Sequence, residues 1–270
     1  MKITFIGGGN MATALIGGLR KQGFSAAGLQ VVDPDDAART RLTDAFGVRS
    51  TPAIDAAALN CEVLLLAVKP QVMKDALQPL AGRLTGQLVI SIAAGLKLAD
   101  IGRWLGGYSR LIRAMPNTPA LIGAGMTGLY AAPDVDNAGR TVAEKILRSV
   151  GKTVWVDDEA LMDAVTAVSG SGPAYVFYFI EALIEAGRQL GLPPETAREL
   201  AIETFVGAAR LAEISSDSVA MLRARVTSKG GTTEAALKVF VEEALDSRII
   251  RGISAAAARG RELSEILGQG

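Results

Sequence analysis

A short stretch late in the chain combines small and hydroxyl side chains in a way that suits anion binding. Residues 226–237 read VTSKGGTTEAAL, and a predicted helix begins at the second threonine of the TT pair. Bare backbone amides at a helix N-terminus, with hydroxyls on either side, are typical of a carboxylate receptor. A purely local role explains less, because ending one helix, capping the next and placing Glu234 in its first turn need only one glycine and one threonine. The residues that this stretch offers to a ligand are Ser228, Gly230, Gly231, Thr232 and Thr233.

A glycine-rich turn follows the first predicted strand. Residues 6–12 read IGGGNMA, with the spacing Gly7-x-Gly9-x-x-Ala12 at the point where the strand ends and a helix begins. Such glycines let the backbone approach a pyrophosphate, whose charge then faces the helix N-terminus. A turn without a ligand is the alternative, but the strand context and an acid at the end of the next strand favour a dinucleotide. The predicted cofactor residues of this turn are Ile6, Gly7, Gly8, Gly9, Asn10 and Met11.

That acid is Asp33, in the sequence VVDPDD. A carboxylate at this position suits a ribose 2′-hydroxyl and repels a 2′-phosphate, so taken alone it favours NADH. A second role, which is compatible with the first, is that of N-cap for a helix starting at Pro34. Arg39 and Arg41 have the charge to offset the repulsion, but we expect them to form a solvated helix face.

Three further strand ends are expected on the carboxyl edge of the same sheet, where ligands of doubly wound folds bind. They read AVKP (67–70), SIAAG (91–95) and MPNTP (115–119). Each has a structural alternative: a proline beginning a helix, small residues for tight packing, and an asparagine that forms a turn. Three such strand ends in succession favour a cofactor-binding surface, here called the cofactor floor, with small residues against which a flat nicotinamide can lie. The predicted floor residues are Ala67, Val68, Lys69, Pro70, Ala93, Ala94, Gly95 and Asn117.

The elements that must position these residues change character near residue 160. Short apolar runs alternate with amphipathic segments in the first part, which predicts a parallel sheet covered on both faces. The predicted strands are residues 2–7, 29–33, 63–68, 87–95 and 110–115, and the predicted helices between them are 10–23, 35–47, 72–84 and 98–107. After Val156 only helical patterns remain, at residues 160–172, 173–191, 195–213, 217–226, 233–245 and 247–267. We therefore expect an α/β dinucleotide-binding domain of Rossmann type at 1–158 and an all-helical domain at 159–270, packed together without a linker.

Composition narrows the classes of partner. The 270 residues are 49% hydrophobic, and 28 Lys plus Arg balance 28 Asp plus Glu without a basic run, so we expect a small-molecule partner and neither nucleic acid nor membrane. No uninterrupted apolar stretch of about 20 residues and no secretory leader are seen, which favours the cytoplasm. The single cysteine, Cys61, adjoins the apolar run VLLLAV and is expected to be a buried hydrophobic side chain. There is no histidine, which excludes imidazole as a general base, proton donor or metal ligand, and we expect no metal.

Six motifs together resemble the pyrroline-5-carboxylate reductases. They are, in chain order, IGGGNM, AVKP, SIAAG, RAMPNTPA, AVSGSGPAY and VTSKGGTTEAAL. The resemblance implies reduction of 1-pyrroline-5-carboxylate to L-proline by hydride from NADPH or NADH, the final step of proline biosynthesis. It also implies a Rossmann domain followed by a helical domain that interleaves with a second subunit, in a homodimer or a larger assembly of dimers. Many family members use NADPH, which conflicts with the preference that Asp33 indicates; we expect both cofactors to work.

The resemblance also assigns the substrate residues. Ser228, Gly230, Gly231, Thr232 and Thr233 match positions that hold the substrate's carboxylate and ring nitrogen. Thr233 matches the position to which a catalytic role is given, either donating a proton or orienting the ring. Glu159 matches a position that contacts the proline product, and its alternative is an acid at a helix N-terminus.

The chemistry of imine reduction agrees with the missing histidine. A cyclic imine can enter already protonated, so hydride arrives without leaving an anion to quench, and the protein mainly aligns the reactants. The segment PAYVFYFIEALI is apolar nearly all round and so requires burial on every side, either in its own domain or against a second subunit. We expect the second arrangement, with an active site shared between subunits. Two alternatives stay open: a β-hydroxyacid dehydrogenase-like enzyme, which would need a lysine acid, and a non-catalytic dinucleotide sensor.

Overall fold

The computed structural model describes residues 1–269, which form two compact units. The sheet unit contains residues 1–171 together with the segment from Ala256 onward, and the helical unit contains residues 172–255. This division differs from the predicted boundary at 158/159, because the helix that begins at Leu161 packs against the sheet. There, a β-carbon added to Gly128 would lie only 2.4 Å from a methyl group of Val165.

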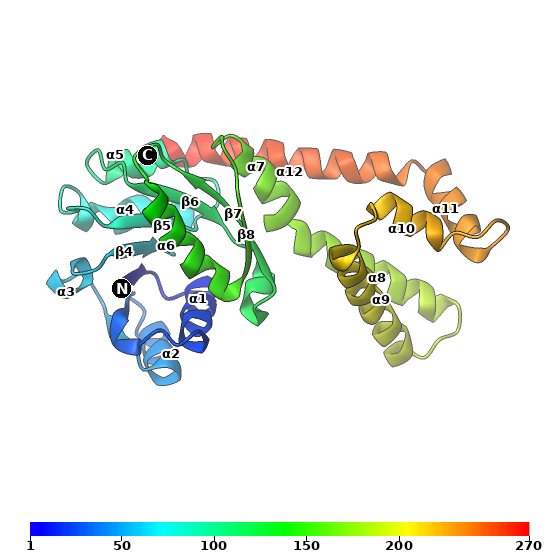
Figure 1. Ribbon diagram of the computed structural model, residues 1–270, viewed down its shortest axis with the longest axis horizontal. Helices are drawn as coiled ribbons and strands as arrows, with labels where there is room; N and C mark the ends of the chain where they lie inside the picture. Colours follow the sequence, from blue (N-terminus) through cyan, green and yellow to red (C-terminus); the bar gives the residue numbers. More distant parts are fainter. Residues whose placement is uncertain (270) are drawn as a thin grey trace. The chain divides into compact units, whose positions relative to one another are not determined.

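Eight strands form one sheet in the order β3-β2-β1-β4-β5-β6-β7-β8 (Figure 1). Their bounds are β1 Ile3–Ile6, β2 Leu29–Val32, β3 Arg49–Thr51, β4 Val63–Leu66, β5 Leu88–Ser91, β6 Leu111–Met115, β7 Gly125–Ala131 and β8 Gly151–Trp155. Neighbouring strands are parallel except β6 and β7, which are antiparallel. The expectation of an entirely parallel sheet is therefore wrong at this one pair, where a short turn of 3₁₀-helix at Thr118–Ile122 reverses the chain.

The five predicted strands are confirmed, and three others were missed. β3 has no apolar residue, reading RST, and β8, at the edge of the sheet, alternates half-buried and exposed positions. β7 is interrupted by Gly128, which weakens a strand pattern. These strands form because the neighbouring strands pair with them.

Helices cover both faces of the sheet, as predicted. Their bounds are α1 Asn10–Lys21, α2 Asp36–Phe46, α3 Ala56–Leu59, α4 Met73–Leu77, α5 Leu98–Trp104, α6 Asn137–Leu147 and α7 Leu161–Val165. Buried residues of α1, α2 and α6 share one core cluster with one set of strand residues, and those of α3, α4 and α5 share another cluster with the alternate set. This is the pattern of a sheet buried on both sides.

One predicted helix of the sheet unit is wrong, and two helices were not predicted. The single helix predicted over 72–84 is broken, because Pro79 has no amide hydrogen and α4 gives way to a 3₁₀ turn at Gln78–Leu80. α3 and α6 were missed, although each has an aspartate N-cap: Asp55 accepts a hydrogen bond from the Ala58 amide and Asp136 from the Gly139 amide.

The helical unit has almost no core of its own. Its helices are α8 Gly172–Gln189, α9 Pro194–Ile214, α10 Val219–Arg225, α11 Thr232–Glu242 and the first part of α12 Leu245–Gly268. In α8 the side chains of Phe177 and Tyr178 are 59% and 70% exposed, so this helix is not buried within its own chain. The stretch Leu161–Gln189 is even long and apolar enough to cross a membrane, by length and composition alone. We expect these exposed apolar side chains to be buried against another protein surface.

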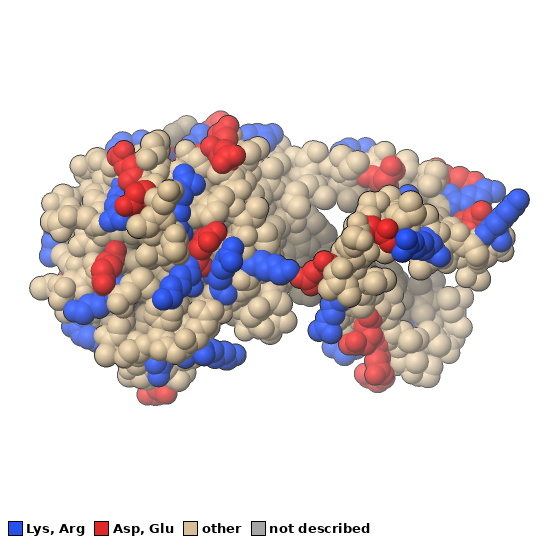
Figure 2. Space-filling model, in the orientation of Figure 1, with Lys and Arg blue, Asp and Glu red and all other residues tan. Residues whose placement is uncertain are grey.

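Charged side chains are mixed over the visible face of the molecule. Figure 2 shows lysines and arginines interspersed with acids, over the sheet unit and over the helical unit alike, in keeping with the balanced composition. On this face there is no large patch of one sign to attract a polyanion.

Candidate active site

The turn between β1 and α1 leaves room for a phosphate group. Gly7 has φ +101°, and a β-carbon there would lie 2.7 Å from the carbonyl oxygen of Ala67, so the turn packs against the end of β4. A β-carbon on Gly9 would meet nothing within 4 Å. Gly9 is the N-cap of α1 without a side-chain cap, and no acid stands in the first turn. Unoccupied amides at the start of a twelve-residue helix, beside open space, fit a pyrophosphate.

Asp33 reaches from the end of β2 to this same turn. Its Oδ2 accepts a hydrogen bond of 2.6 Å from the Gly8 amide, and its Oδ1 accepts one of 2.8 Å from the Asp35 amide. The predicted N-cap role is wrong: α2 begins at Asp36, and Asp35 caps it through the Ala37 amide. With two backbone donors on a carboxylate that has about four acceptor positions, Asp33 retains capacity for ribose hydroxyls.

The two arginines of α2 do not form a simple solvated face, contrary to expectation. Arg39 donates from Nη1 to the carbonyl oxygens of Asp33 and Pro34, and from Nη2 to the carboxylate of Asp36. Arg41 donates from Nη2 to the carbonyl oxygen of Gly8 at 2.9 Å. Both guanidinium groups therefore lie around the junction of β2 and the glycine-rich turn.

The SIAAG segment is covered on one side by the end of α12. Ala94 is exposed, whereas Ala93 and Gly95 are buried. Gly95 has φ +75°, and a β-carbon on it would lie 3.6–3.9 Å from atoms of Leu263, Ser264 and Leu267. The C-terminus of this helix is held beside α5, since Arg103 Nη2 donates to the carbonyl of Gly268 at 2.6 Å (Figure 1). The left-handed φ favours glycine at this position whatever the surrounding space, and contact of Gly95 with a cofactor stays a prediction.

Asn117, at the end of β6, has its side-chain amide fully engaged within the protein. Nδ2 donates to the carbonyl oxygen and to the hydroxyl of Ser169 at 3.2 and 3.3 Å, and Oδ1 accepts from the Met126 amide at 2.9 Å. Ser169 belongs to a single π-helical turn, Thr166–Gly170, that follows α7 within the SGSG motif. Asn117 therefore ties this turn to the carboxyl edge of the sheet, and a direct contact with the cofactor stays a prediction.

Glu159 belongs to a buried charge cluster that the sequence did not reveal. Arg113 of β6 is 3% exposed, and its guanidinium lies 3.3 Å from Glu159 Oε1 and 3.5 Å from Asp163 Oδ1. Glu159 Oε1 also accepts a hydrogen bond from the Leu98 amide at the start of α5. The one available signal was an arginine inside the otherwise apolar strand RLIRAM. These contacts give Glu159 a structural role within the sheet unit, and its contact with a substrate stays a prediction.

The substrate loop predicted at 228–233 lies in the helical unit, directly before α11. Gly231 is the N-cap of α11 and no side chain caps it, so the local alternative, in which a threonine caps this helix, does not hold. Of the two glycine amides, that of Gly230 donates to Glu234 Oε2 at 2.7 Å and that of Gly231 to the Ser228 carbonyl at 3.0 Å.

The two threonines keep their polar groups unused. Across residues 1–269 no hydrogen bond is recorded for the hydroxyl or the amide of Thr232 or Thr233. An open groove of about 600 Å³ runs beside the loop along α11, and its lining includes Gly230 and Gly231. The two threonines are not among the residues that line this groove, so their contact with a ligand stays a prediction.

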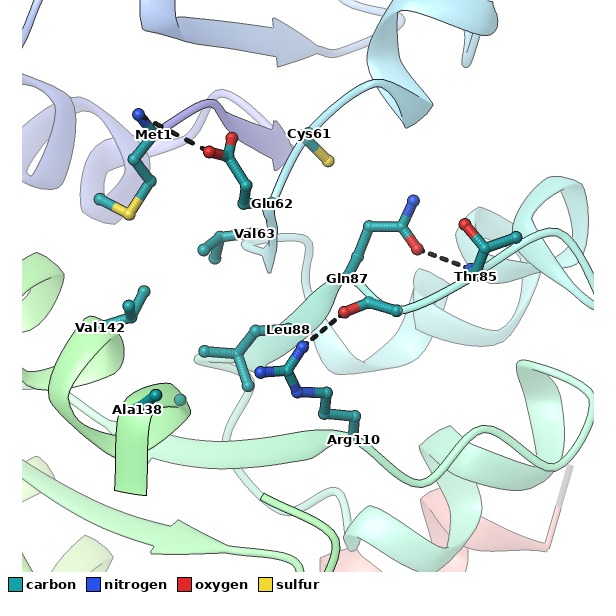
Figure 3. Close-up of a pocket in the computed structure, with 12 residues that line it drawn as sticks. Met1, Cys61, Glu62, Val63, Thr85, Gln87, Leu88, Arg110, Ala138 and Val142 are labelled. Atoms are coloured by element: carbon teal, nitrogen blue, oxygen red, sulfur yellow. Dashed lines mark hydrogen bonds and ion pairs between the residues drawn. The ribbon is translucent and has the colours of Figure 1, made fainter. Parts of the chain in front are cut away.

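A separate pocket of about 500 Å³ lies at the opposite edge of the sheet (Figure 3). It is lined by residues at the amino ends of strands, such as Val63 and Leu88, together with Cys61 and Arg110. Ligands of this fold class bind at the carboxyl ends. Burial raises the pKa of the Cys61 thiol, which opposes a nucleophilic role. Among residues 1–269 no cluster of three acids or cysteines could hold a metal ion.

Comparison with known proteins identifies both parts of the chain. Residues 159–263 match the family model of pyrroline-5-carboxylate reductase dimerisation, and residues 2–95 match that of NADP oxidoreductase, coenzyme F420-dependent. A pyrroline-5-carboxylate reductase of Pseudomonas aeruginosa is 46% identical, over 99% of this chain and 98% of its own. The structure of a pyrroline-5-carboxylate reductase from Coxiella burnetii matches with a TM-score of 0.93 at 44% identity, covering 97% of this chain and 98% of that one. A pyrroline carboxylate reductase of Plasmodium falciparum, solved with NADP bound, matches with a TM-score of 0.86 at 27% identity, over 98% of both chains.

Proposed function

This chain belongs to the pyrroline-5-carboxylate reductase family and reduces 1-pyrroline-5-carboxylate to proline with NAD(P)H; from this premise, we propose how its residues divide the work. The carboxyl edge of the sheet holds the dinucleotide, and the loop 228–233 holds the imino acid. The dinucleotide site is supported chiefly by the start of α1, which has no side-chain cap and lies beside the open space at Gly9. The two alternatives considered from the sequence, another Rossmann oxidoreductase and a non-catalytic sensor, have no feature here that favours them.

The dinucleotide is held by backbone more than by side chains. Gly7, Gly8 and Gly9 let its pyrophosphate approach the first amides of α1, where the helix dipole stabilises negative charge. The ribose lies towards Asp33, whose carboxylate is already oriented by the Gly8 and Asp35 amides. The ends of β4, β5 and β6 form the floor towards the nicotinamide.

The imino acid is held at the start of α11. The amides of Thr232 and Thr233 are unused, and the hydroxyls beside them can donate to a carboxylate or orient a ring nitrogen. Thr233 is half-buried whereas Thr232 is exposed, which supports Thr233 as the residue nearer the reacting ring. The Glu234 carboxylate fixes the loop by accepting the Gly230 amide.

The protein itself needs no strong acid. When bound, NAD(P)H supplies the hydride, and a protonated imine accepts it without forming an anion. The chain has no histidine, and the roles left to its side chains are to bind, orient and exclude water. Thr233 contributes a hydroxyl placed at the ring nitrogen.

Both reduced cofactors are accepted. Asp33 favours NADH through its acceptor oxygens, and the relative from Plasmodium falciparum, which binds NADP, supports access for the phosphorylated form. The preference between NADH and NADPH depends on the charged side chains around the junction of β2 and the glycine-rich turn.

The working unit is a homodimer or an assembly of dimers, with a cytoplasmic location. The dimerisation domain exposes apolar side chains on α8, α9 and α11, which a second copy covers. The active site combines the cofactor edge of one subunit with the loop 228–233 of another.

A steady-state assay tests this assignment. Oxidation of NADH and of NADPH is followed with pyrroline-5-carboxylate, with pyruvate as a ketone control, for the wild type and for Gly9→Asp. The wild type oxidises both cofactors only with the imine, and Gly9→Asp, which adds a charge where the pyrophosphate lies, loses the activity while keeping its fold. Equal oxidation with pyruvate, or full activity of Gly9→Asp, would contradict the proposal.

A further inference from the structure

The guanidinium of Arg41 is fixed over the glycine-rich turn rather than free in solvent. Its Nη2 donates to the carbonyl oxygen of Gly8 at 2.9 Å, although the residue as a whole is exposed on α2. In the described part of the chain this is the single hydrogen bond of the Arg41 side chain. A guanidinium carries five N–H donors in a rigid fork. Most of its donors therefore remain available to a ligand beside the glycine-rich turn.

Gly8 links this cation to the carboxylate of Asp33. The Gly8 amide donates to Asp33 Oδ2 at 2.6 Å, while the Gly8 carbonyl accepts from Arg41. One peptide thus connects an anionic group and a cationic group, and neither neutralises the other in a direct ion pair among the described residues. Asp33 obtains its two hydrogen bonds from backbone amides, so it needs no arginine to orient it.

We propose that Arg41 is the specificity-determining residue that binds the 2′-phosphate of NADPH, while Asp33 accepts the ribose hydroxyls of NADH. This inference rests on the proposed function, in which the dinucleotide occupies this edge of the sheet. Arginine binds phosphate with paired, charge-assisted hydrogen bonds, which offset the repulsion from a nearby carboxylate. A site that contains both Asp33 and Arg41 accepts both cofactors. The two side chains set the ratio of kcat/KM for NADPH to that for NADH.

Arg39 lies two positions earlier on the same helix and provides a matched control. Its Nη1 donates to the carbonyl oxygens of Asp33 and Pro34, its Nη2 pairs with Asp36, and its side chain is 16% exposed. These contacts hold the turn between β2 and α2. Replacing Arg39 removes the same charge from the same helix but not the donors that face a ligand.

Two nucleotide fragments separate the phosphate from the rest of the cofactor. Binding of 2′,5′-ADP and of 5′-AMP is measured by calorimetry for the wild type, Arg41→Gln and Arg39→Gln, together with kcat/KM for NADPH and NADH. Losing charge-assisted hydrogen bonds to phosphate lowers affinity about 10- to 100-fold. For Arg41→Gln we expect such a loss for 2′,5′-ADP relative to 5′-AMP, and the same fall in the NADPH to NADH ratio. For Arg39→Gln we expect both ratios to stay within about twofold of the wild type.

The outcomes are distinct. If Arg41→Gln weakens both nucleotides equally, or leaves the advantage of 2′,5′-ADP unchanged, the assignment of Arg41 is wrong although the cofactor site stands. If Arg39→Gln lowers the ratio as much as Arg41→Gln, the effect is one of general charge and the inference is also overturned. If neither nucleotide binds the wild type, the cofactor site itself is misplaced, and this inference is overturned with it.

Discussion

The side chain of Asn117 holds Ser169 by two hydrogen bonds, one to its carbonyl oxygen and one to its hydroxyl. Together with the Met126 amide, which donates to Asn117 Oδ1, this contact joins the ends of β6 and β7 to the π-helical turn of the SGSG motif. The turn packs closely on the sheet, because a β-carbon on Gly170 would lie 2.4 Å from the methyl group of Met115. Single π-turns often mark functional sites, and this one lies at the edge where the cofactor is proposed to bind.

Replacing Asn117 is expected to weaken both the fold and catalysis. Asn117→Ala leaves a part-buried amide, carbonyl and hydroxyl without their partner, which costs about 1–3 kcal/mol in the free energy of unfolding. Ser169→Ala removes one acceptor and is expected to cost less. Urea unfolding followed by circular dichroism gives the stabilities, and kcat/KM for NADPH reports the cofactor edge. Equal stability of Asn117→Ala and the wild type would contradict the bracing role.

Thr233→Ala is expected to lower kcat/KM for the imine without destabilising the protein. The hydroxyl at the ring nitrogen is lost, which reduces the rate about 10- to 1000-fold if the bond forms chiefly in the transition state. Stability is unchanged because Gly231, not a threonine, is the N-cap of α11. Thr227→Ala is the control, since its hydroxyl donates to the Arg223 carbonyl in the preceding helix. A normal rate for Thr233→Ala would leave this residue without a catalytic role.

Asp33→Ser is expected to move cofactor preference towards NADPH. The substitution removes the carboxylate that repels a 2′-phosphate, so the ratio of kcat/KM for NADPH to that for NADH rises. Asp35→Ala is the control, because it removes the N-cap of α2 at a cost of about 1 kcal/mol in stability while leaving Asp33 in place. An unchanged ratio in Asp33→Ser would limit Asp33 to fixing the Gly8 amide.

Mixing two impaired variants tests whether subunits share active sites. Gly9→Asp damages the cofactor edge without a steric clash, since its β-carbon meets nothing within 4 Å, and Thr233→Ala damages the substrate loop. In a mixed dimer one composite site keeps both intact halves, so activity returns on subunit exchange. Native mass spectrometry confirms that mixed dimers have formed. Mixed dimers that stay inactive would place each site within one chain.

The thiol of Cys61 is expected to resist alkylation. The residue is half-buried rather than buried as the sequence predicted, and burial raises its pKa above the ordinary value of 9.0, so at pH 8 the thiol is mostly neutral. Because the folded pKa is the higher one, this group stabilises the fold fully below pH 9.0 and progressively less as the pH rises through the folded pKa. Iodoacetamide labelling at pH 8, compared between native and urea-unfolded protein, checks the shielding. Equal labelling rates in the two states would show an accessible thiolate.

Local patterns in the sequence were enough for the class of fold and for the family. Apolar runs of four or five residues between amphipathic segments predicted β1, β2, β4, β5 and β6, because burial on both faces of a sheet leaves a continuous apolar signature. The helices from residue 160 onward were predicted from the helical repeat of their apolar positions. The order of six short motifs, from IGGGNM to VTSKGGTTEAAL, identified the chemistry, since each motif is contiguous. Edge strands such as β3 carry no such signature and were missed.

Tertiary structure alone decided the partners of the polar side chains. Asp33 pairs with Gly8 across 25 residues, Glu159 with Arg113 across 46, and Asn117 with Ser169 across 52. Spacing along the chain cannot predict such contacts, because a side chain bonds to whatever the fold brings near it, and any acid or amide suits several local roles equally well. The sequence therefore determined the fold class and the family, and it predicted the two ligand segments. The folded chain decided that Asp33 orients a peptide rather than capping α2, and that Arg41 lies over the turn rather than in open solvent.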